Sequence, residues 1–270
     1  MLWFFVIGIA CTSGSSIRSS ERYRRFVNSR DAKKEEWKFH AKFKYNHAAN
    51  VAWKTCSGAL IESRWLLTAA HCVRNRESIN INASDFSVIL HEGVDRVVEH
   101  AVAHFYTPPY PNVEHTRMMF DNDIALVQLE KEAPEFMEKI QYRSTPRRLF
   151  NCTAAGWGAT KQMTRDDYKT GNYHLAKKLK EIDGSVVDFK TFCKGFEPSK
   201  KICFAKTDKD MIFTNGGCIG DSGSPIVCES EKGKFLLGIS IGGDIECKPN
   251  AVIATDVRAW VRWLASRLYK

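Results

Sequence analysis

Three short segments of the chain carry the side chains of a nucleophile, a base and a carboxylate. TAAHC contains His71 next to Cys72, NDIAL contains Asp123, and GDSGSP places Ser222 in a glycine-containing turn. A serine hydroxyl is too weakly acidic to attack a carbonyl group unaided, so a histidine must take its proton. The histidine needs an acceptor on its other ring nitrogen, which fixes the tautomer and stabilises the imidazolium. The order His, Asp, Ser therefore predicts nucleophilic catalysis by Ser222, with His71 as general base and Asp123 as its orienting partner.

The elements that must position these side chains are mostly short strands. From Cys56 onward, runs rich in Val, Ile, Leu and aromatic residues alternate with turn residues, which is typical of strands. The runs cover residues 58–61, 65–70, 86–90, 97–103, 124–129 and 236–241. Only the C-terminal segment 257–268 has a convincing helical period. Many strands and one terminal helix favour an all-β barrel or sandwich.

The composition bounds the class of protein. The 270 residues are 44% apolar and 26% charged, which excludes a collagen-like, coiled-coil or wholly disordered chain. The 40 basic and 31 acidic side chains give a formal net charge of +9, which permits contact with anionic surfaces. The sequence contains no nucleic-acid-binding motif, and we expect no nucleic-acid partner.

The N-terminus is typical of an exported precursor. Residues 2–10 form an apolar run shorter than the roughly 20 residues that a membrane span needs. We expect a signal peptide over residues 1–16, a polar pro-segment over 17–25 and a secreted, extracellular protein; the alternative is a buried first strand. No later stretch is long and apolar enough to span a bilayer. Nine cysteines suit an oxidising compartment, and removal of Cys11 leaves an even number whose pairing the sequence alone leaves open.

Together these segments resemble the chymotrypsin/trypsin-like serine proteases. The resemblance covers residues 26 to about 268 and includes TAAHC, NDIAL and GDSG, with CSGALI, CTAAGWG, SIG and TDVRAWVRWL as supporting segments. It implies two six-stranded antiparallel β-barrels and a C-terminal α-helix, within a protease domain over residues 26–270. The barrels would meet somewhere between residues 130 and 150. The active site would lie between them and draw its residues from both halves.

The resemblance also implies the cross-links of the chain and the donors around Ser222. The expected disulfides are Cys56–Cys72, Cys152–Cys228, Cys193–Cys203 and Cys218–Cys247. The backbone N–H groups of Gly220 and Ser222 would form the oxyanion hole, where each donor lowers the barrier by about 2.7–4 kcal/mol. Ser240 would donate a hydrogen bond to Asp123. Ser224, at a position usually occupied by glycine in the family, lies outside the donor pair.

Activation is expected at the end of the pro-segment. Family members are cut before Ile-Val-Gly-Gly, and the freed ammonium group pairs with the aspartate that precedes the catalytic serine, here Asp221. This chain has Arg25 followed by Phe-Val-Asn-Ser. We therefore predict a zymogen that an activating protease cuts after Arg25, with Phe26 as the new N-terminus. Asn28 replaces a glycine of the pattern and tolerates the positive φ that glycine allows.

The segments that resemble the substrate pocket predict cleavage after uncharged residues. Gly216, six residues before Ser222, occupies the pocket base, where family members that select Arg or Lys carry Asp. Ser240 and Gly242 line the wall. If Val252 enters the pocket, small apolar residues should be preferred. If it does not, larger apolar or aromatic residues should be.

The remaining signals assign no metal and no cofactor. His100 and His104 lack a nearby cysteine or matched carboxylate, and a solvated strand edge explains them better than a metal pair. Asn82 begins an Asn-Ala-Ser sequon and is the predicted glycosylation site. A second sequon begins at Asn151, but its middle residue is a cysteine expected in a disulfide.

Two classes of function follow from these features. The first is a secreted serine endopeptidase acting on protein or peptide substrates, with an activating protease and protein inhibitors as further partners. The second is a protease-like binding or regulatory protein without turnover, whose basic side chains form an anion-binding surface. The side chains of that surface would be Arg143, Arg147, Arg148, Lys177, Lys178, Lys180, Lys200 and Lys201. Relatives of the second kind usually lose a triad residue, whereas this chain keeps His71, Asp123, Ser222 and Gly220.

Overall fold

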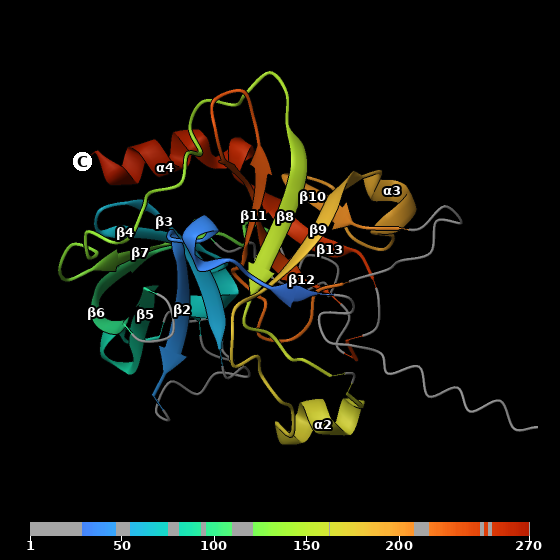
Figure 1. The fold of residues 1–270 in the computed structure, drawn as a ribbon, viewed down its shortest axis with the longest axis horizontal. Helices are drawn as coiled ribbons and strands as arrows, with labels where there is room; N and C mark the ends of the chain where they lie inside the picture. The colour runs from blue at the N-terminus through green and yellow to red at the C-terminus, as the bar shows by residue number, and fades with distance from the viewer. Residues whose placement is uncertain are drawn as a thin grey trace, which may run out of the picture.

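The structure, a computed structural model, describes most of the chain between residues 29 and 269. The described residues are 29–46, 55–74, 81–92, 96–109, 121–161, 163–207, 216–243, 246–247 and 250–269. They form two closed barrels of antiparallel strands, several short helices and a C-terminal helix (Figure 1). The fold class predicted from the sequence is therefore confirmed. The predicted signal peptide and pro-segment lie outside the described residues, as does Phe26.

The first barrel closes in the order β2-β3-β4-β7-β6-β5. Its strands are β2 (His40–Tyr45), β3 (Cys56–Glu62), β4 (Trp65–Thr68), β5 (Phe86–Glu92), β6 (Arg96–Tyr106) and β7 (Ala125–Leu129). Alternate residues of a strand point to opposite faces, and Phe86, Val88 and Leu90 of β5 are accordingly all buried. They face a core that also holds Phe43 and Leu126, both without solvent exposure. This alternation is the pattern that predicted the strand at residues 86–90.

The second barrel contains six strands from the C-terminal half. They are β8 (Phe150–Gly156), β9 (Lys180–Val187), β10 (Lys201–Ala205), β11 (Pro225–Glu229), β12 (Phe235–Gly242) and β13 (Val252–Asp256). The sheet order β9-β10-β13-β12-β11-β8 closes because β8 also pairs with β9. Phe204 and Phe235 are the largest fully buried side chains of this barrel. In Figure 1 these strands, coloured yellow-green to red, stand beside the blue-to-green strands of the first barrel.

Residues 130–149 connect the two barrels, within the interval predicted from the resemblance. The connection is attached to both sides, because the Ile140 N–H donates to the Leu60 carbonyl at 2.9 Å and Gln141 forms an isolated bridge with Phe235. Within the connection, the guanidinium of Arg143 lies 4.9 Å from the ring centroid of Tyr269, just beyond the C-terminal helix. The connection therefore ties the C-terminus to both barrels.

The helices differ in part from the sequence prediction. The C-terminal helix begins with a 3₁₀ turn, η6 (Val257–Trp260), and continues as α4 (Val261–Leu268). Short helices that the sequence did not predict are η1 (Lys34–Glu36), η3 (Ala70–Val73), η4 (Ala83–Asp85), α2 (Arg165–Thr170) and α3 (Phe189–Phe192). Each spans at most about two turns, too short to establish a helical period. Among the described residues, no helix is long and apolar enough to cross a membrane.

The eight cysteines pair as the resemblance implied. The disulfides are Cys56–Cys72, Cys152–Cys228, Cys193–Cys203 and Cys218–Cys247. The first joins β3 to the 3₁₀ turn η3, the second joins β8 to β11, and the third joins the residue after α3 to β10. The fourth joins two segments outside the strands, one just before Ser222 and one just after β12. Two of the four cross-links therefore hold segments that carry the predicted catalytic residues.

The N-terminal part of the described chain is attached to the second barrel. The short strand β1 (Arg30–Asp31) pairs with β9 through Arg30 opposite Glu181. The Arg30 guanidinium donates to Glu181 at 2.6 Å and to Asp183 at 2.5 and 2.8 Å. Glu181 is buried and also accepts a hydrogen bond from the Trp37 indole N–H at 2.6 Å. The first residues that the structure describes are therefore fixed beside β9.

Candidate active site

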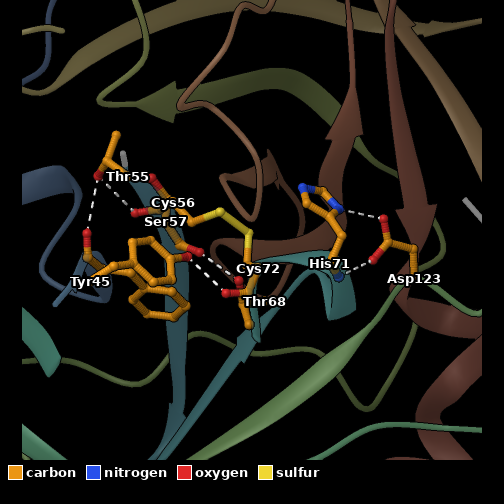
Figure 2. Close-up of a disulfide and its surroundings, with 9 residues drawn as sticks. Tyr45, Thr55, Cys56, Ser57, Thr68, His71, Cys72 and Asp123 are labelled. Atoms are coloured by element: carbon orange, nitrogen blue, oxygen red, sulfur yellow. Dashed lines mark hydrogen bonds and ion pairs between the residues drawn. A yellow bond between two sulfur atoms is a disulfide. The ribbon is translucent and has the colours of Figure 1, made fainter. Parts of the chain in front are cut away.

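His71 and Asp123 form the best-defined contact of the predicted triad. The Nδ1 atom of His71 lies 2.7 Å from Oδ2 of Asp123, and the His71 backbone N–H donates to Oδ1 at 2.8 Å (Figure 2). The Asp123 side chain is 2% exposed, whereas that of His71 is 24% exposed. A buried carboxylate that holds one ring nitrogen of a histidine fixes the orientation and the tautomer of the ring, as a general base requires. The two residues therefore have the geometry of an oriented general base.

Local structure around His71 fixes the position of its ring. His71 lies in η3, directly after β4, where buried Leu66 and Leu67 pack into the first barrel. Its neighbour Cys72 is disulfide-bonded to Cys56 at the start of β3, as Figure 2 shows. The apolar strand and the cross-link together determine where the chain turns, and thus where the imidazole lies.

Asp123 is held from the second barrel as well as from the first. Its backbone carbonyl accepts a hydrogen bond from the Thr255 hydroxyl of β13 at 2.7 Å. Asn122, just before it, has a positive φ of 53°, a conformation that Asn tolerates better than most residues. The hydrogen bond expected from Ser240 to the Asp123 carboxylate is not among those of the described residues. Both carboxylate oxygens instead accept from His71, and the Ser240 backbone bonds Gly223 and Ser224.

Ser222 sits in a turn clamped between β3 and β12. Its carbonyl accepts from the Ser57 N–H at 2.8 Å, and the next residue, Gly223, donates to the Ser240 carbonyl at 2.7 Å. Gly223 has a φ of +79°, and a Cβ there would lie 2.0 Å from the Ser57 carbonyl oxygen. Ser57 follows Cys56, which is bonded to the neighbour of His71. The turn can therefore approach β3 only with glycine after the serine, and this approach places the Ser222 backbone against Ser57 of β3.

The predicted oxyanion donors, the N–H groups of Gly220 and Ser222, lie in the turn that carries the serine. Gly220 has a φ of +90°, and a Cβ there would lie 3.0 Å from both Leu175 and Thr55. Asp221 and Gly223 donate their N–H groups to Cys218 and Ser240. In the described part of the chain, the N–H groups of Gly220 and Ser222 donate to no protein acceptor. Both donors are thus available to a ligand.

Asp221 is the second buried carboxylate of the site, as little exposed as Asp123. Its oxygens accept hydrogen bonds from the Gly158 N–H at 2.8 Å and from the Cys218 N–H at 2.9 Å. Burial raises the pKa of this carboxyl group to about 7, against the lowering effect of the two backbone donors. No cationic side chain among the described residues contacts it. Asp221 therefore occupies a socket that contains no counter-charge in the described chain.

Two glycines make room for the Asp221 carboxylate. A Cβ on Gly158 would lie 2.4 Å from Oδ2 of Asp221, and one on Gly156 would lie 2.2 Å from Oδ1. In the sequence the Gly-Trp-Gly segment is only one of the motifs of the resemblance, and the structure shows its physical role: both glycines leave space for the Asp221 carboxylate. Sequence reasoning also missed Thr255, because a threonine in an apolar strand carries no signal of its contact with Asp123.

The residues predicted to form the substrate pocket lie on three adjoining segments. Gly216 is buried, Ser240 is 5% exposed, and Gly242 ends β12 opposite Ile253 of β13. Val252 is 2% exposed, and its Cγ2 lies 3.0 Å from the position of a Cβ on Gly217. Val252 therefore packs against the segment that leads to Ser222.

The structure also describes the predicted glycosylation site and one grouping of metal-type ligands. Asn82 is exposed and precedes η4, so its side chain is accessible. Among the described residues, the grouping of metal-type ligands is Cys56, His71 and Cys72, whose two sulfur atoms are bonded to each other. A disulfide offers no thiolate to a metal ion, so this grouping does not fit a metal site. Arg25 and Phe26 lie outside the described residues.

Comparison with known proteins gives consistent matches over most of the chain. The profile of the Trypsin family matches residues 26–264. Human chymotrypsin-like elastase family member 3B is 27% identical over 95% of this chain and 93% of its own length. Bovine chymotrypsin-C is 27% identical over 97% of this chain and 96% of its own length. Human granzyme M is 29% identical over 77% of each chain.

A solved structure matches the fold. Neuropsin, described as a serine protease expressed in the limbic system of mouse brain, superposes with a TM-score of 0.67 at 21% identity. The match covers 88% of this chain and 98% of the neuropsin chain. At this identity the similarity supports the two-barrel architecture alone.

Proposed function

The chain belongs to the trypsin family of serine proteases, and from this premise we propose that it is a secreted serine endopeptidase made as a zymogen. The proposal rests on one observation above all. A His71–Asp123 pair with two contacts of 2.7 and 2.8 Å lies in the same region as a clamped Ser222 turn that carries two unengaged backbone donors. A base, a nucleophile and an anion-stabilising pair of donors are the parts that acyl transfer requires.

The proposed reaction follows from these parts. His71 takes the proton of the Ser222 hydroxyl, and the serine oxygen bonds to the carbonyl carbon of the substrate. The carbonyl oxygen gains the negative charge, which the N–H groups of Gly220 and Ser222 stabilise. His71 then gives its proton to the departing amine as the peptide bond breaks, leaving an acyl group on Ser222. A water molecule, deprotonated by His71, releases the second product by the same steps.

We propose that activation acts through the buried carboxylate of Asp221. Cutting after Arg25 would free an ammonium group at Phe26, four residues before Arg30. Glu181 of β9 lies opposite Arg30 on one side and opposite Ala155 of β8 on the other. Arg30 is therefore two strand spacings, or about 10 Å, from β8. Four extended residues span up to about 13 Å, enough for the ammonium to reach the Asp221 carboxylate. The ion pair would neutralise a carboxylate that is otherwise buried without a cation.

Secretion is proposed from the N-terminal apolar run together with the disulfides. Four disulfides occur in the described residues, and such bonds persist mainly in oxidising compartments. The family membership implies protein or peptide substrates. An activating protease and protein inhibitors are proposed as further partners, and Asn82 as a glycosylation site.

Substrate preference provides the test of the proposed activity. Gly216 brings no charge to the pocket base, and Val252 packs beside Gly217, which favours small uncharged residues before the cut. We expect the activated protein to hydrolyse matched peptide substrates with Ala before the cut at least tenfold faster, in kcat/KM, than those with Arg. The Ser222→Ala variant, treated identically, should hydrolyse neither. Faster turnover of the Arg substrate would contradict the preference, and no turnover of any substrate would contradict the activity.

The competing proposal of an anion-binding protein without turnover is less well supported. Several cations of the suggested surface already have acidic partners: Arg143 pairs with Glu62, Lys178 and Lys180 pair with Asp31, and Lys201 pairs with Asp121. Lys200 lies 4.4 Å from the ring centroid of Trp260. A surface whose charges are internally paired attracts anions weakly.

A further inference from the structure

We propose that Asn151 carries an N-linked glycan, as a modification site in addition to the one proposed at Asn82. The inference rests on the proposed export of the chain and not on its catalysis, because N-linked glycans are attached to exported chains. Asn151 begins the sequon Asn-Cys-Thr in β8. The middle residue, Cys152, is disulfide-bonded in the folded protein, so the modification must be compatible with that bond.

The Asn151 side chain is accessible in the folded protein. Asn151 is exposed, and it follows Phe150, which is itself 47% exposed. The side-chain amide nitrogen of Asn151 donates a hydrogen bond to Oε2 of Glu229 at 2.8 Å. That nitrogen carries two hydrogens, and an N-linked sugar replaces only one of them. The bond to Glu229 can therefore persist beside an attached glycan.

A surface cavity that Asn151 lines offers space for the first sugar. The other side chains of the cavity include charges of both signs, among them Arg30, Glu229 and Lys234. The Lys234 ammonium lies 3.5 Å from Oε2 of Glu36, another side chain of the cavity. Sugar hydroxyl groups both donate and accept hydrogen bonds, so a neutral sugar can use ammonium and carboxylate groups alike. The surroundings of Asn151 therefore suit a glycan in shape and in chemistry.

The order of synthesis removes the obstacle of the disulfide. Cys152 is bonded to Cys228, at a sequence separation of 76 residues. A chain is synthesised and exported from its N-terminus, so the sequon enters the compartment before Cys228 is there to pair with Cys152. At that stage the segment is not yet a strand between β9 and β11, as it is in the finished barrel. The sequon can therefore be modified as a free, extended chain before the barrel closes.

The backbone at Asn151 decides which variants test the site. Its φ of 46° lies in the left-handed region, which Asn tolerates better than Gln, so Asn151→Gln would strain β8 as well as remove the sequon. Thr153 is the better position. Thr153→Val removes the sequon and keeps the branched shape of the side chain. Thr153→Ser keeps both the sequon and the hydroxyl that donates to Asp183 at 3.3 Å.

The test uses the full chain expressed in a eukaryotic secretory host, with glycans measured by the mass lost on treatment with a peptide N-glycosidase. The parent and Thr153→Ser should lose the same mass, and Thr153→Val should lose one glycan less. Release in heavy-oxygen water labels each asparagine that carried a glycan, and peptide mass spectrometry should find the label at position 151. Ser84→Ala removes only the Asn82 sequon and is the matched control, which should keep the label at position 151.

Cys228→Ser separates an unused sequon from one that the disulfide blocks. This variant cannot close the bond to Cys152, and its occupancy at Asn151 should equal that of the parent. Occupancy is measured on cell-associated and secreted chains alike, so the result does not depend on complete folding of the variant.

Two results would overturn the inference, and they differ in what they leave standing. A secreted parent without the label at position 151 would overturn the glycan at Asn151 and leave the export proposal intact, whether or not Cys228→Ser carries the label. A parent chain retained in the cell with residues 1–16 still attached would overturn the export proposal, and the glycan with it.

Discussion

Replacing Asp123 by Asn is expected to lower kcat by about 10⁴-fold, the loss typical of this change in a serine protease triad. Both oxygens of the carboxylate accept hydrogen bonds from His71, one from the backbone N–H at 2.8 Å and one from the ring at 2.7 Å. An amide offers only one acceptor oxygen, so its NH₂ group must face one of these donors. If it faces the ring, Nδ1 becomes an acceptor and the proton moves to the nitrogen that should act as the base.

The measurement is steady-state hydrolysis of one peptide substrate by the activated parent and the activated Asp123→Asn protein. KM should change little, because Asp123 is 2% exposed and is not placed to touch substrate. Asp188→Asn is a matched control: Asp188 caps α3 at the surface, and Asn is an equally good cap, so activity should stay within twofold. An Asp123→Asn protein that keeps a tenth or more of the parent kcat would contradict the proposed role of Asp123.

Replacing Asp221 by Asn is expected to have opposite effects on the uncleaved and the cleaved protein. In the uncleaved protein the carboxyl is buried without a cation in the described chain, and its pKa is raised from 3.8 to about 7. The folded state thus keeps a proton that the unfolded chain releases near pH 4, so folded protein binds more protons between about pH 4 and 7. Stability therefore falls as pH rises through this window, by up to about 4 kcal/mol. The amide side chain of the variant cannot titrate, and this pH dependence should disappear.

In the cleaved protein the same substitution should be damaging. The new ammonium group at Phe26 would meet a neutral amide instead of a carboxylate, and loss of one partner of a buried pair costs about 3–5 kcal/mol. That penalty corresponds to an active population smaller by about 10²-fold to 5 × 10³-fold.

Denaturant unfolding of the uncleaved parent and Asp221→Asn proteins at pH 5 and pH 7.5 tests the first effect, and kcat/KM after cleavage tests the second. Asp188→Asn again serves as the control for both. A parent protein whose unfolding free energy is unchanged or increased between the two pH values, relative to the variant, would contradict the burial argument. A cleaved variant with parental activity would contradict the role of Asp221 in activation.

Most of the strands could be predicted from the sequence, because the spacing of apolar residues along a strand is a regular pattern. The alternation in β5 and the apolar run of β7 placed two strands of the first barrel, and the period of residues 257–268 placed the terminal helix. The short helices were missed, since α3 depends on capping by the Asp188 side chain rather than on an apolar face. A local side-chain cap over so few residues leaves no pattern that a sequence window can detect.

Some residues of the candidate site could be predicted from the sequence, and others could not. His71 and Asp123 were predicted by residue type and spacing, and the structure brings them into contact. The expected Ser240 contact with Asp123 is absent from the described residues, where the Asp123 carboxylate accepts from His71 and the Asp123 backbone carbonyl accepts from Thr255. Gly158 acts through its close approach to the Asp221 carboxylate, which depends on the packing of loops and not on local sequence.

We propose that His71, Asp123 and Ser222 form a working site that cleavage after Arg25 switches on. The most direct test is fluorophosphonate labelling of the full chain before and after controlled cleavage at Arg25, with N-terminal sequencing to verify the cut and Ser222→Ala as the control. We predict labelling that appears when the chain begins at Phe26 and is absent from the uncleaved protein and from the Ser222→Ala protein. Verified cleavage at Arg25 without labelling of the parent protein would contradict the claim.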